Sequence, residues 1–235
     1  MQNKYNYSAI HFDSVDSTST YARTHAGELA LPAVISANMQ TAGRGRTGKS
    51  FYSPADTGLY FSLLTYAPKN VTLITPTAGV AVCKAVEELT PVKPRIKWVN
   101  DVFAGGKKIC GILTEKFKDR DCEYLCIGIG VNITTVDFPK ELINAGSIGK
   151  IVDKKLLMKR ILFNIFDIFD NSTDIEIQKI YSDKMILNNK KISYTFNGEK
   201  RLGICRGIDE NCSLVVADSE GGLVKLKSGE VEIAE

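Results

Sequence analysis

The sequence GRGRTGKS, at residues 43–50, matches the phosphate-binding loop pattern G-x-x-x-x-G-K-[ST]. In such a loop a helix begins at the Lys-Ser/Thr pair, and its first N–H groups and its dipole surround the phosphates. Here Pro54 and Gly58 follow, and residues 58–66 have the aromatic and apolar character of a strand. The sequence also has no convincing apolar strand ending in aspartate that would hold Mg²⁺ beside such a loop. We therefore predict that this segment is not a phosphate-binding loop.

The same segment carries Arg44, Arg46 and Lys49, and no acidic residue occurs between Ala37 and Ala55. A solvated surface loop is one interpretation. The interpretation we favour is a glycine-hinged cationic lid that closes over a ligand bearing a phosphate or a carboxylate. A second group of cations follows later in the chain: Lys93, Arg95, Lys97, Lys107 and Lys108. Because the net charge is only +3, these local clusters indicate a compact anionic ligand rather than a nucleic acid.

The 235-residue chain has an ordinary globular composition, with 44% hydrophobic and 24% charged residues. Its length predicts one large domain, or one large and one small domain. Its six cysteines have neither Cys-x-x-Cys pairs nor zinc-site spacing, which predicts buried, reduced thiols. No signal peptide and no apolar run of the roughly 20 residues that a membrane helix needs is present, so we expect a cytoplasmic protein without a membrane partner.

Residue patterns predict mixed strands and helices up to residue 185. Strands are expected at residues 8–13, 32–40, 58–66 and 123–133, with a strand–turn–strand unit over 95–117 that turns at Gly105–Gly106. The clearest helix covers residues 153–170 with Asp153 as its N-cap, and others are expected at 75–90 and after Ser17–Ser19. From residue 186 onward, short alternating strands predict a small β-barrel-like module packed on the main domain.

Several motifs, in this order, resemble those of the biotin protein ligase family. They are DSTS (16–19), QTAGRGRTGKSFYSP (40–54), GLYFSL (58–63), KWVND (97–101), KKICGILTE (107–115), GIGVNI (128–133) and a terminal SGEV (228–231). The likeness extends from about His11 to Val231. Each motif is weak alone, but their combination in one order is specific.

The resemblance implies an α+β fold. Residues 1–185 would form a catalytic domain with a mixed sheet flanked by helices, similar to class II synthetases, and residues 186–235 an SH3-like β-barrel. It also implies a ligase that uses ATP to activate biotin as biotinyl-5′-AMP. The enzyme would then transfer biotin to a lysine of a biotin carboxyl carrier protein, for example the one in acetyl-CoA carboxylase. The first step joins two anions, so cations and Mg²⁺ are what the chemistry requires.

The family's functional residues map onto this chain through the shared motifs. Those implied for biotin binding are Ser17, Thr18, Gln40, Gly43, Arg44, Gly45, Arg46, Lys108, Gly111 and Gly128. Those implied for ATP binding are Arg44, Gly48, Lys49, Phe51, Lys97, Asn100, Asp101, Asn132 and Ser147. The implied catalytic groups are Lys108, Arg44, Arg46 and Asp101, with Lys108 in contact with the reacting carboxylate and α-phosphate. Asn100 and Asp101 are the expected Mg²⁺ ligands.

Four positions depart from the family pattern: Ser19 replaces Asn, Lys49 replaces Arg, Phe51 replaces Trp and Val99 replaces Pro. None removes a charge that the chemistry needs, so the departures bear on nucleotide affinity and loop order. Two alternatives stay open, a lipoate–protein ligase, which shares fold and chemistry, and a non-catalytic biotin sensor. Because only about ten residues precede the first motif, we expect no DNA-binding domain and no DNA partner. A homodimer is left open.

Overall fold

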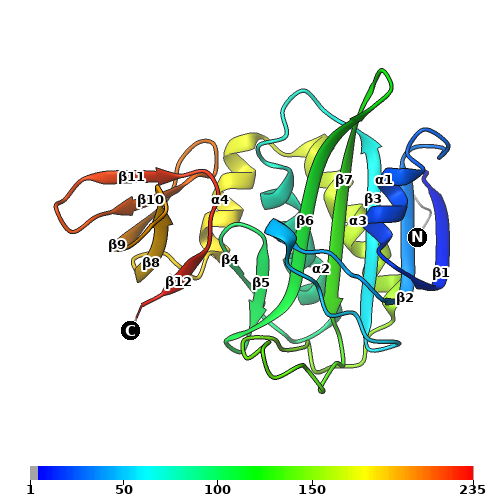
Figure 1. The fold of residues 1–235 in the computed structure, drawn as a ribbon, viewed down its shortest axis with the longest axis horizontal. Helices are drawn as coiled ribbons and strands as arrows, with labels where there is room; N and C mark the ends of the chain where they lie inside the picture. Colours follow the sequence, from blue (N-terminus) through cyan, green and yellow to red (C-terminus); the bar gives the residue numbers. More distant parts are fainter. Residues whose placement is uncertain (1–4, 235) are drawn as a thin grey trace.

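The N-terminal part of the chain folds around one mixed sheet (Figure 1). The computed structural model describes residues 5–234. The sheet has seven strands in the order β1-β2-β3-β7-β6-β5-β4; β1 and β2 pair in parallel and the other neighbours pair antiparallel. The strands are β1 (Ser8–Val15), β2 (Ala33–Gln40), β3 (Gly58–Tyr66), β4 (Arg95–Lys97), β5 (Asp101–Ala104), β6 (Lys107–Asp119) and β7 (Cys122–Asn132).

Helices cover both faces of this sheet. They are α1 (Thr18–Thr24), α2 (Ile74–Leu89), α3 (Lys154–Asn171) and α4 (Asp174–Lys184). α2 and α3 lie behind the sheet in Figure 1, whereas α1 lies in front of it. Side chains alternate along a strand, so β2 serves both faces. Val34 joins the core that includes α2 and α3, while Ala33 and Ile35 pack in a separate cluster with Ala22 of α1.

The predicted helices form, and one further helix was not predicted. The Asp153 carboxylate accepts hydrogen bonds from the N–H groups of Lys155 (2.8 Å) and Leu156 (3.1 Å), which caps α3 as expected. The unpredicted helix, α4, begins with a capping box between Thr173 and Glu176. Because α4 buries only two of its side chains, its sequence has no strong apolar periodicity from which a helix could be predicted.

One expected strand is wrong in detail, because residues 95–104 form a hairpin rather than one strand. β4 and β5 pair antiparallel, with Lys97 opposite Asp101. The KWVND motif therefore occupies a tight turn, whose Trp98–Val99 peptide bond is cis. The Tyr181 hydroxyl of α4 donates to the Val99 carbonyl (3.1 Å) and ties this turn to the helix.

The C-terminal residues form a second, antiparallel sheet in the order β11-β10-β9-β8-β12. Its strands are β8 (Lys191–Phe196), β9 (Glu199–Ile208), β10 (Leu214–Ala217), β11 (Leu223–Leu226) and β12 (Val231–Ile233). The Trp98 indole Nε1 donates to the Cys212 carbonyl (2.8 Å), and one hydrophobic cluster continues from the large sheet to Tyr194 and Leu214. The mixed sheet with helices and the smaller C-terminal sheet confirm the predicted fold class. The domain boundary at 185/186 stays a prediction.

The segment between β2 and β3 contains no α-helix, as expected of a loop that is not a phosphate-binding loop. It contains the single-turn 3₁₀ helix η1 (Arg46–Gly48). The Gly45 N–H donates to the Lys49 carbonyl (2.7 Å) and the Phe51 N–H to the Gly43 carbonyl (2.8 Å), so the chain folds back on itself. None of the helices in residues 5–234 is both long and apolar enough to cross a membrane.

The burial of the cysteines predicts a simple labelling result. Cys122 is exposed at the start of β7, and the other five thiols are buried. Burial raises the pKa of Cys83, Cys126 and Cys212 to about 12, which keeps these thiols protonated as well as covered. At pH 8 a thiol reagent should modify only Cys122 in the native protein and all six cysteines after unfolding. Peptide mass spectrometry checks this. Native Cys122→Ser protein should stay unlabelled, and rapid labelling of a buried thiol would contradict the packing.

Candidate active site

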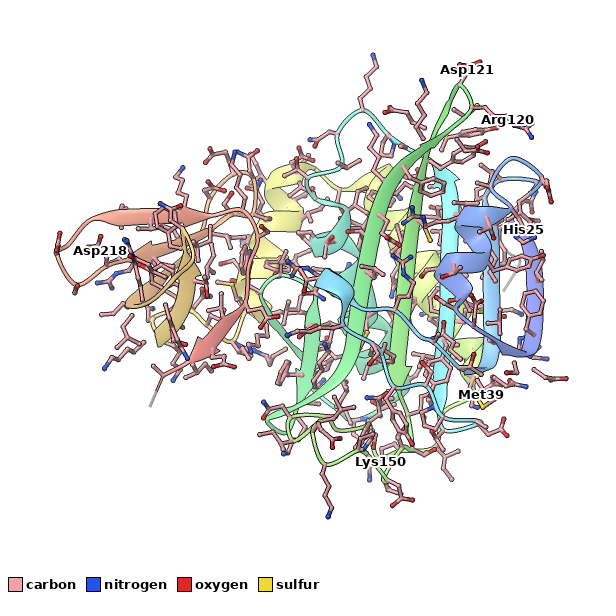
Figure 2. All side chains as sticks on the ribbon, viewed as in Figure 1. His25, Met39, Arg120, Asp121, Lys150 and Asp218 are labelled. Atoms are coloured by element: carbon pink, nitrogen blue, oxygen red, sulfur yellow. The ribbon has the colours of Figure 1, made fainter. Side chains whose placement is uncertain are left out.

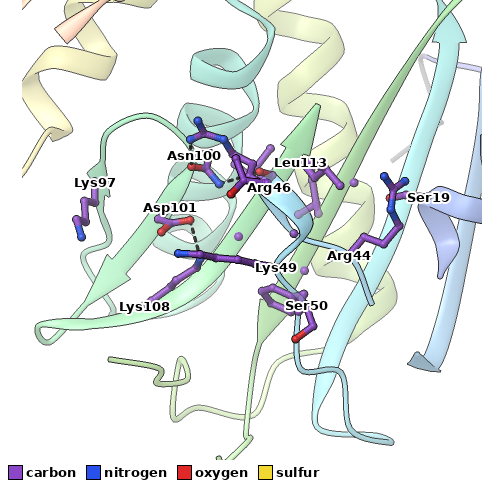
Figure 3. Close-up of a pocket in the computed structure, with 18 of the residues that line it drawn as sticks. Ser19, Arg44, Arg46, Lys49, Ser50, Lys97, Asn100, Asp101, Lys108 and Leu113 are labelled. Carbon is purple, nitrogen blue, oxygen red and sulfur yellow. Dashed lines mark hydrogen bonds and ion pairs between the residues drawn. The ribbon is translucent and has the colours of Figure 1, made fainter. Parts of the chain in front are cut away.

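A cavity of about 470 Å³ lies on the α1 face of the large sheet (Figure 3). Its walls come from parts of the chain far apart in sequence: the loop between β2 and β3, the start of α1, strands β6 and β7, the turn before β5, and residues 228–232 of the small sheet. The cavity therefore forms only when both sheets are in place.

Hydroxyl and amide side chains line one end of the cavity, on the side where Arg44 is paired with a carboxylate. The Thr18 hydroxyl and backbone N–H both donate to the Gln40 amide oxygen (3.2 and 2.9 Å). The hydroxyl groups of Thr18 and Ser19 each lie within hydrogen-bonding distance of the fully buried Ser62 hydroxyl (2.9 and 3.0 Å). The Gln40 amide nitrogen donates to Ser53 (2.8 Å). These groups can bind a neutral ligand that both donates and accepts hydrogen bonds.

The floor of the cavity is bare strand backbone, because glycines replace side chains on that face. Gly111 of β6 lies opposite Gly130 of β7, and Gly128 is two residues earlier on the same face. A Cβ at Gly128 would stand 2.6 Å from Ser19 Oγ, and one at Gly111 would stand 3.0 Å from the Phe51 ring. The Phe51 ring therefore lies on the sheet itself. Leu113, two residues after Gly111 on the same face of β6, adds an apolar side chain to this middle section.

The other end of the cavity is cationic. Lys108 Nζ forms an ion pair with Asp101 Oδ1 (2.7 Å), and Arg46 Nη1 donates to Asn100 Oδ1 (2.8 Å), as Figure 3 shows. Lys97 is also part of the lining. Asn100 is held in turn by β6, because its side-chain nitrogen donates to the Ile112 carbonyl (3.0 Å). This end can bind an anionic group beside the Asp101–Lys108 pair.

Glu115 holds two arginines from different elements. Arg44 donates to both Glu115 carboxylate oxygens (2.8 Å each), and Arg23 of α1 donates to Oε1 (2.7 Å). A bidentate pair is geometrically specific, so Glu115 fixes Arg44 on the side of the cavity across from Lys108 and Asp101 (Figure 3). The same carboxylate ties the loop to α1.

The small sheet contributes a carboxylate of its own. Glu230 forms an ion pair with Lys49 of the loop. The pKa of Glu230 is held below its usual value, first by the hydrogen bond from Lys49 and then by the positive charges of Lys49, Arg46 and Lys97. The loop is thus fastened to the small sheet through Lys49 and to β6 through Arg44.

Most residues expected at the site surround this cavity. Those that line it are Thr18, Gln40, Arg44, Gly45, Arg46, Lys49, Phe51, Lys97, Asn100, Asp101, Lys108, Gly111 and Gly128. Others do not line it: Ser17, Gly43, Gly48, Asn132 and Ser147. Ser17 caps α1 instead, accepting from the Thr20 N–H (3.4 Å), and Asn132 is buried and donates to the Gly146 carbonyl (3.0 Å). The roles assigned to all of these residues stay predictions.

The sequence assigned no site role to Ser19, Gly130 and Glu230, which line the cavity, or to Ser62 and Glu115, which bind residues of the lining. Gly130 had a usable signal, since Gly128-x-Gly130 in a strand places both glycines on one face. No local pattern could have revealed Glu115, because its partner Arg44 lies 71 positions earlier in the chain.

The cavity contains no histidine, and residues 5–234 contain no cluster of side chains suited to hold a metal ion by themselves. The two histidines do not line the cavity; His25 lies beside α1, on the side of the molecule away from the small sheet (Figure 2). No group of three or more His, Cys, Asp or Glu side chains gathers there in a way that could hold a metal ion. Asp101 and Asn100 still present oxygens at the cationic end, which fits Mg²⁺ arriving with phosphates, since that ion needs few protein ligands.

Comparison with known proteins identifies the family. Residues 11–132, just over half of the chain, match the model of the biotin/lipoate A/B protein ligase family. The chain belongs to this family. The bifunctional ligase/repressor BirA of Bacillus subtilis (strain 168) is 29% identical over 239 residues, which cover 95% of this chain and 73% of that protein. The corresponding protein of Salmonella typhimurium (strain LT2) is 27% identical over 234 residues, covering 92% and 73%.

Solved structures agree with this assignment. Biotin protein ligase from Aquifex aeolicus, in complex with biotin and ATP, matches with a TM-score of 0.83 and 28% identity, over 97% of this chain and 99% of that chain. The resemblance predicted from the motifs is therefore confirmed, and the fold is that of a biotin protein ligase.

The paired arginines at Glu115 predict a measurable contribution to stability. Glu115→Gln keeps the shape of the side chain but removes the charge that holds Arg23 and Arg44. We expect a loss of about 1–2 kcal/mol in the free energy of unfolding, at the lower end for charged hydrogen bonds because water screens two partly exposed guanidinium groups. Urea unfolding followed by circular dichroism measures it.

Glu199→Gln is the matched control for this variant. Glu199 binds Arg201 on an exposed hairpin (2.8 Å), so its change should stay within about 0.5 kcal/mol. Equal effects of the two substitutions would show that Glu115 has no special role in holding the loop.

Proposed function

We propose that this protein activates biotin with ATP to give biotinyl-5′-AMP and transfers the biotinyl group to a lysine of a biotin carboxyl carrier protein. The observation that carries the proposal is the order of chemistry along the cavity: uncharged hydrogen-bonding groups, then an apolar section over bare backbone, then cations. Biotin has a neutral ureido ring system, an aliphatic chain and a terminal carboxylate, which match this order. The family membership and the Aquifex aeolicus ligase solved with biotin and ATP support the same conclusion.

In the first step, a biotin carboxylate oxygen bonds to the α-phosphorus of ATP and pyrophosphate leaves. Thr18, Ser19 and Gln40 bind the ureido group, so the carboxylate is directed to the cationic end. There Lys108 and Arg46 offset the repulsion between the carboxylate and the phosphates and stabilise the charge that develops as the bond forms. We assign the Phe51 ring, part of the cavity lining, to pack against the nucleotide base.

We assign Mg²⁺ to the same end of the cavity. Mg²⁺ carried by ATP would be held by Asp101 and Asn100, and it supplies further positive charge on the phosphates. The protein's own part is to hold these two oxygens beside Lys108 and Arg46. Asn100 is fixed by its bond to the Ile112 carbonyl, so its amide oxygen stays turned toward Arg46.

In the second step, the acceptor lysine amine bonds to the acyl carbon and AMP leaves. The amine must first lose a proton, and Asp101 is the carboxylate we assign to accept it, since it lies in the cavity beside Lys108. The ion pair with Lys108 holds the Asp101 carboxylate in place.

Isotope exchange between pyrophosphate and ATP tests the proposal against its nearest rival. We expect exchange that depends on biotin and is not supported by lipoate. Incubation with biotin, ATP, Mg²⁺ and a biotin carboxyl carrier domain of acetyl-CoA carboxylase should then label one lysine of that domain. Exchange with lipoate alone would make the protein a lipoate ligase, and biotin binding with neither exchange nor carrier labelling would make it a non-catalytic biotin sensor.

A single substitution tests the central catalytic assignment. Lys108→Ala should lower the rate of adenylate formation by about 10²–10³-fold, the usual cost of removing one group that stabilises developing charge. Biotin affinity, measured by calorimetry, should change far less, because the ureido contacts lie at the other end of the cavity. Equal losses in binding and rate would refute the role.

Lys107→Ala is the matched control for this test. Lys107 is the neighbouring lysine, is exposed, and donates to the Ile143 carbonyl (2.6 Å) outside the cavity lining. Its removal should leave adenylate formation within about threefold of the wild-type rate, as expected for an exposed side chain away from the reacting groups.

A further inference from the structure

A second hollow, which we call the basic groove, lies between the β4–β5 hairpin and β12. Its volume is about 550 Å³. Three cations line it, Lys93, Arg95 and Lys97, together with the apolar side chains Phe103, Ile186 and Ile233. All three belong to the cation cluster that is predicted from the sequence to bind a compact anionic ligand, yet only Lys97 lines the catalytic cavity. Lys93 and Arg95 therefore need another explanation.

The cations of the basic groove differ from those of the cavity in having no acidic partner. Within residues 5–234, no carboxylate lies within ion-pair distance of Lys93, Arg95 or Lys97, whereas Lys49 and Lys108 are each paired. Three unpaired charges at alternate positions repel one another, which makes a bound anionic surface favourable. Glu232 is the acid in the lining.

The basic groove adjoins the catalytic cavity. Lys97 and Glu232 line both hollows. The lining also includes Gly105 and Gly106, the turn that leads directly into Lys107 and Lys108 on β6. A molecule bound in the groove would therefore hold its nearest residues beside the Lys108–Asp101 pair.

We infer that the basic groove docks an acidic face of the acceptor protein, next to the lysine that receives biotin. This inference rests on the proposed function. Residues 93 to 97 span about 13 Å if extended, longer than a pyrophosphate group. The half-buried Phe103 and Ile186 and the exposed Ile233 also suit a protein surface better than a phosphate chain. The cations supply attraction and orientation, and the chemistry stays with Lys108 and Asp101.

Charge reversal at the outer part of the groove tests the inference. The double variant Lys93→Glu/Arg95→Glu leaves every residue placed in the catalytic machinery intact. We expect its KM for a biotin carboxyl carrier domain to rise about tenfold or more, as for loss of complementary charge at an interface. Biotin-dependent ATP–pyrophosphate exchange should stay at the wild-type rate, and so should transfer to hydroxylamine, a small acceptor that needs no docking.

Lys200→Glu/Arg206→Glu is the matched control, with the same change in net charge. Both residues are exposed on β9, lie outside the groove lining, and have no ion pair within the described residues. This variant should keep the wild-type KM for the carrier domain. Raising the NaCl concentration should increase that KM for the wild-type protein and the control, and much less for the groove variant.

The outcomes separate the docking inference from the proposed function. An unchanged carrier KM in the groove variant overturns the docking inference while carrier labelling still supports the proposed function. Loss of exchange activity, or a higher KM for ATP or pyrophosphate, assigns the groove to phosphates and also overturns it. Absence of biotinyl-AMP and of carrier labelling with the wild-type protein removes the proposed function, and the docking inference with it.

Discussion

The cations around the cavity repel one another. Several of them stay in place because each is paired with a carboxylate from another part of the fold. Lys108 is paired with Asp101 across the β5–β6 hairpin, and Arg44 with Glu115 of β6. Lys49 is paired with Glu230 of the small sheet. Each partner stabilises the positive charge in place. As a result the loop, the large sheet and the small sheet must all be assembled before the site exists.

The sheet itself supplies the second requirement, which is space. A mixed sheet normally covers its faces with side chains, but β6 and β7 present Gly111, Gly128 and Gly130 on the α1 face. Phe51 rests on that bare backbone, and the Ser19 hydroxyl comes close to it at Gly128. The opposite face keeps an apolar core with α2 and α3. One face of the sheet thus provides stability and the other provides binding.

Local signals in the sequence predicted local structure well and long-range contacts poorly. The Asp153 cap, the Gly105–Gly106 turn and the absence of a helix after Lys49 follow from neighbouring residues, and the structure agrees with all three. α4 was missed because it buries few side chains, and the turn in KWVND was missed because tertiary packing decides it. The Glu115 and Glu230 partners pair residues far apart in sequence, which no local pattern encodes.

The central claim is that this site makes an acyl-adenylate from a carboxylate bound at the end opposite its neutral head group. The most direct measurement is mass spectrometry of the small molecules bound to the protein after incubation with biotin, ATP and Mg²⁺, followed by gel filtration and denaturation. The account predicts biotinyl-5′-AMP in the wild-type sample and none when biotin or ATP is omitted. Unreacted biotin and ATP alone, from protein that is folded and binds both, would contradict it.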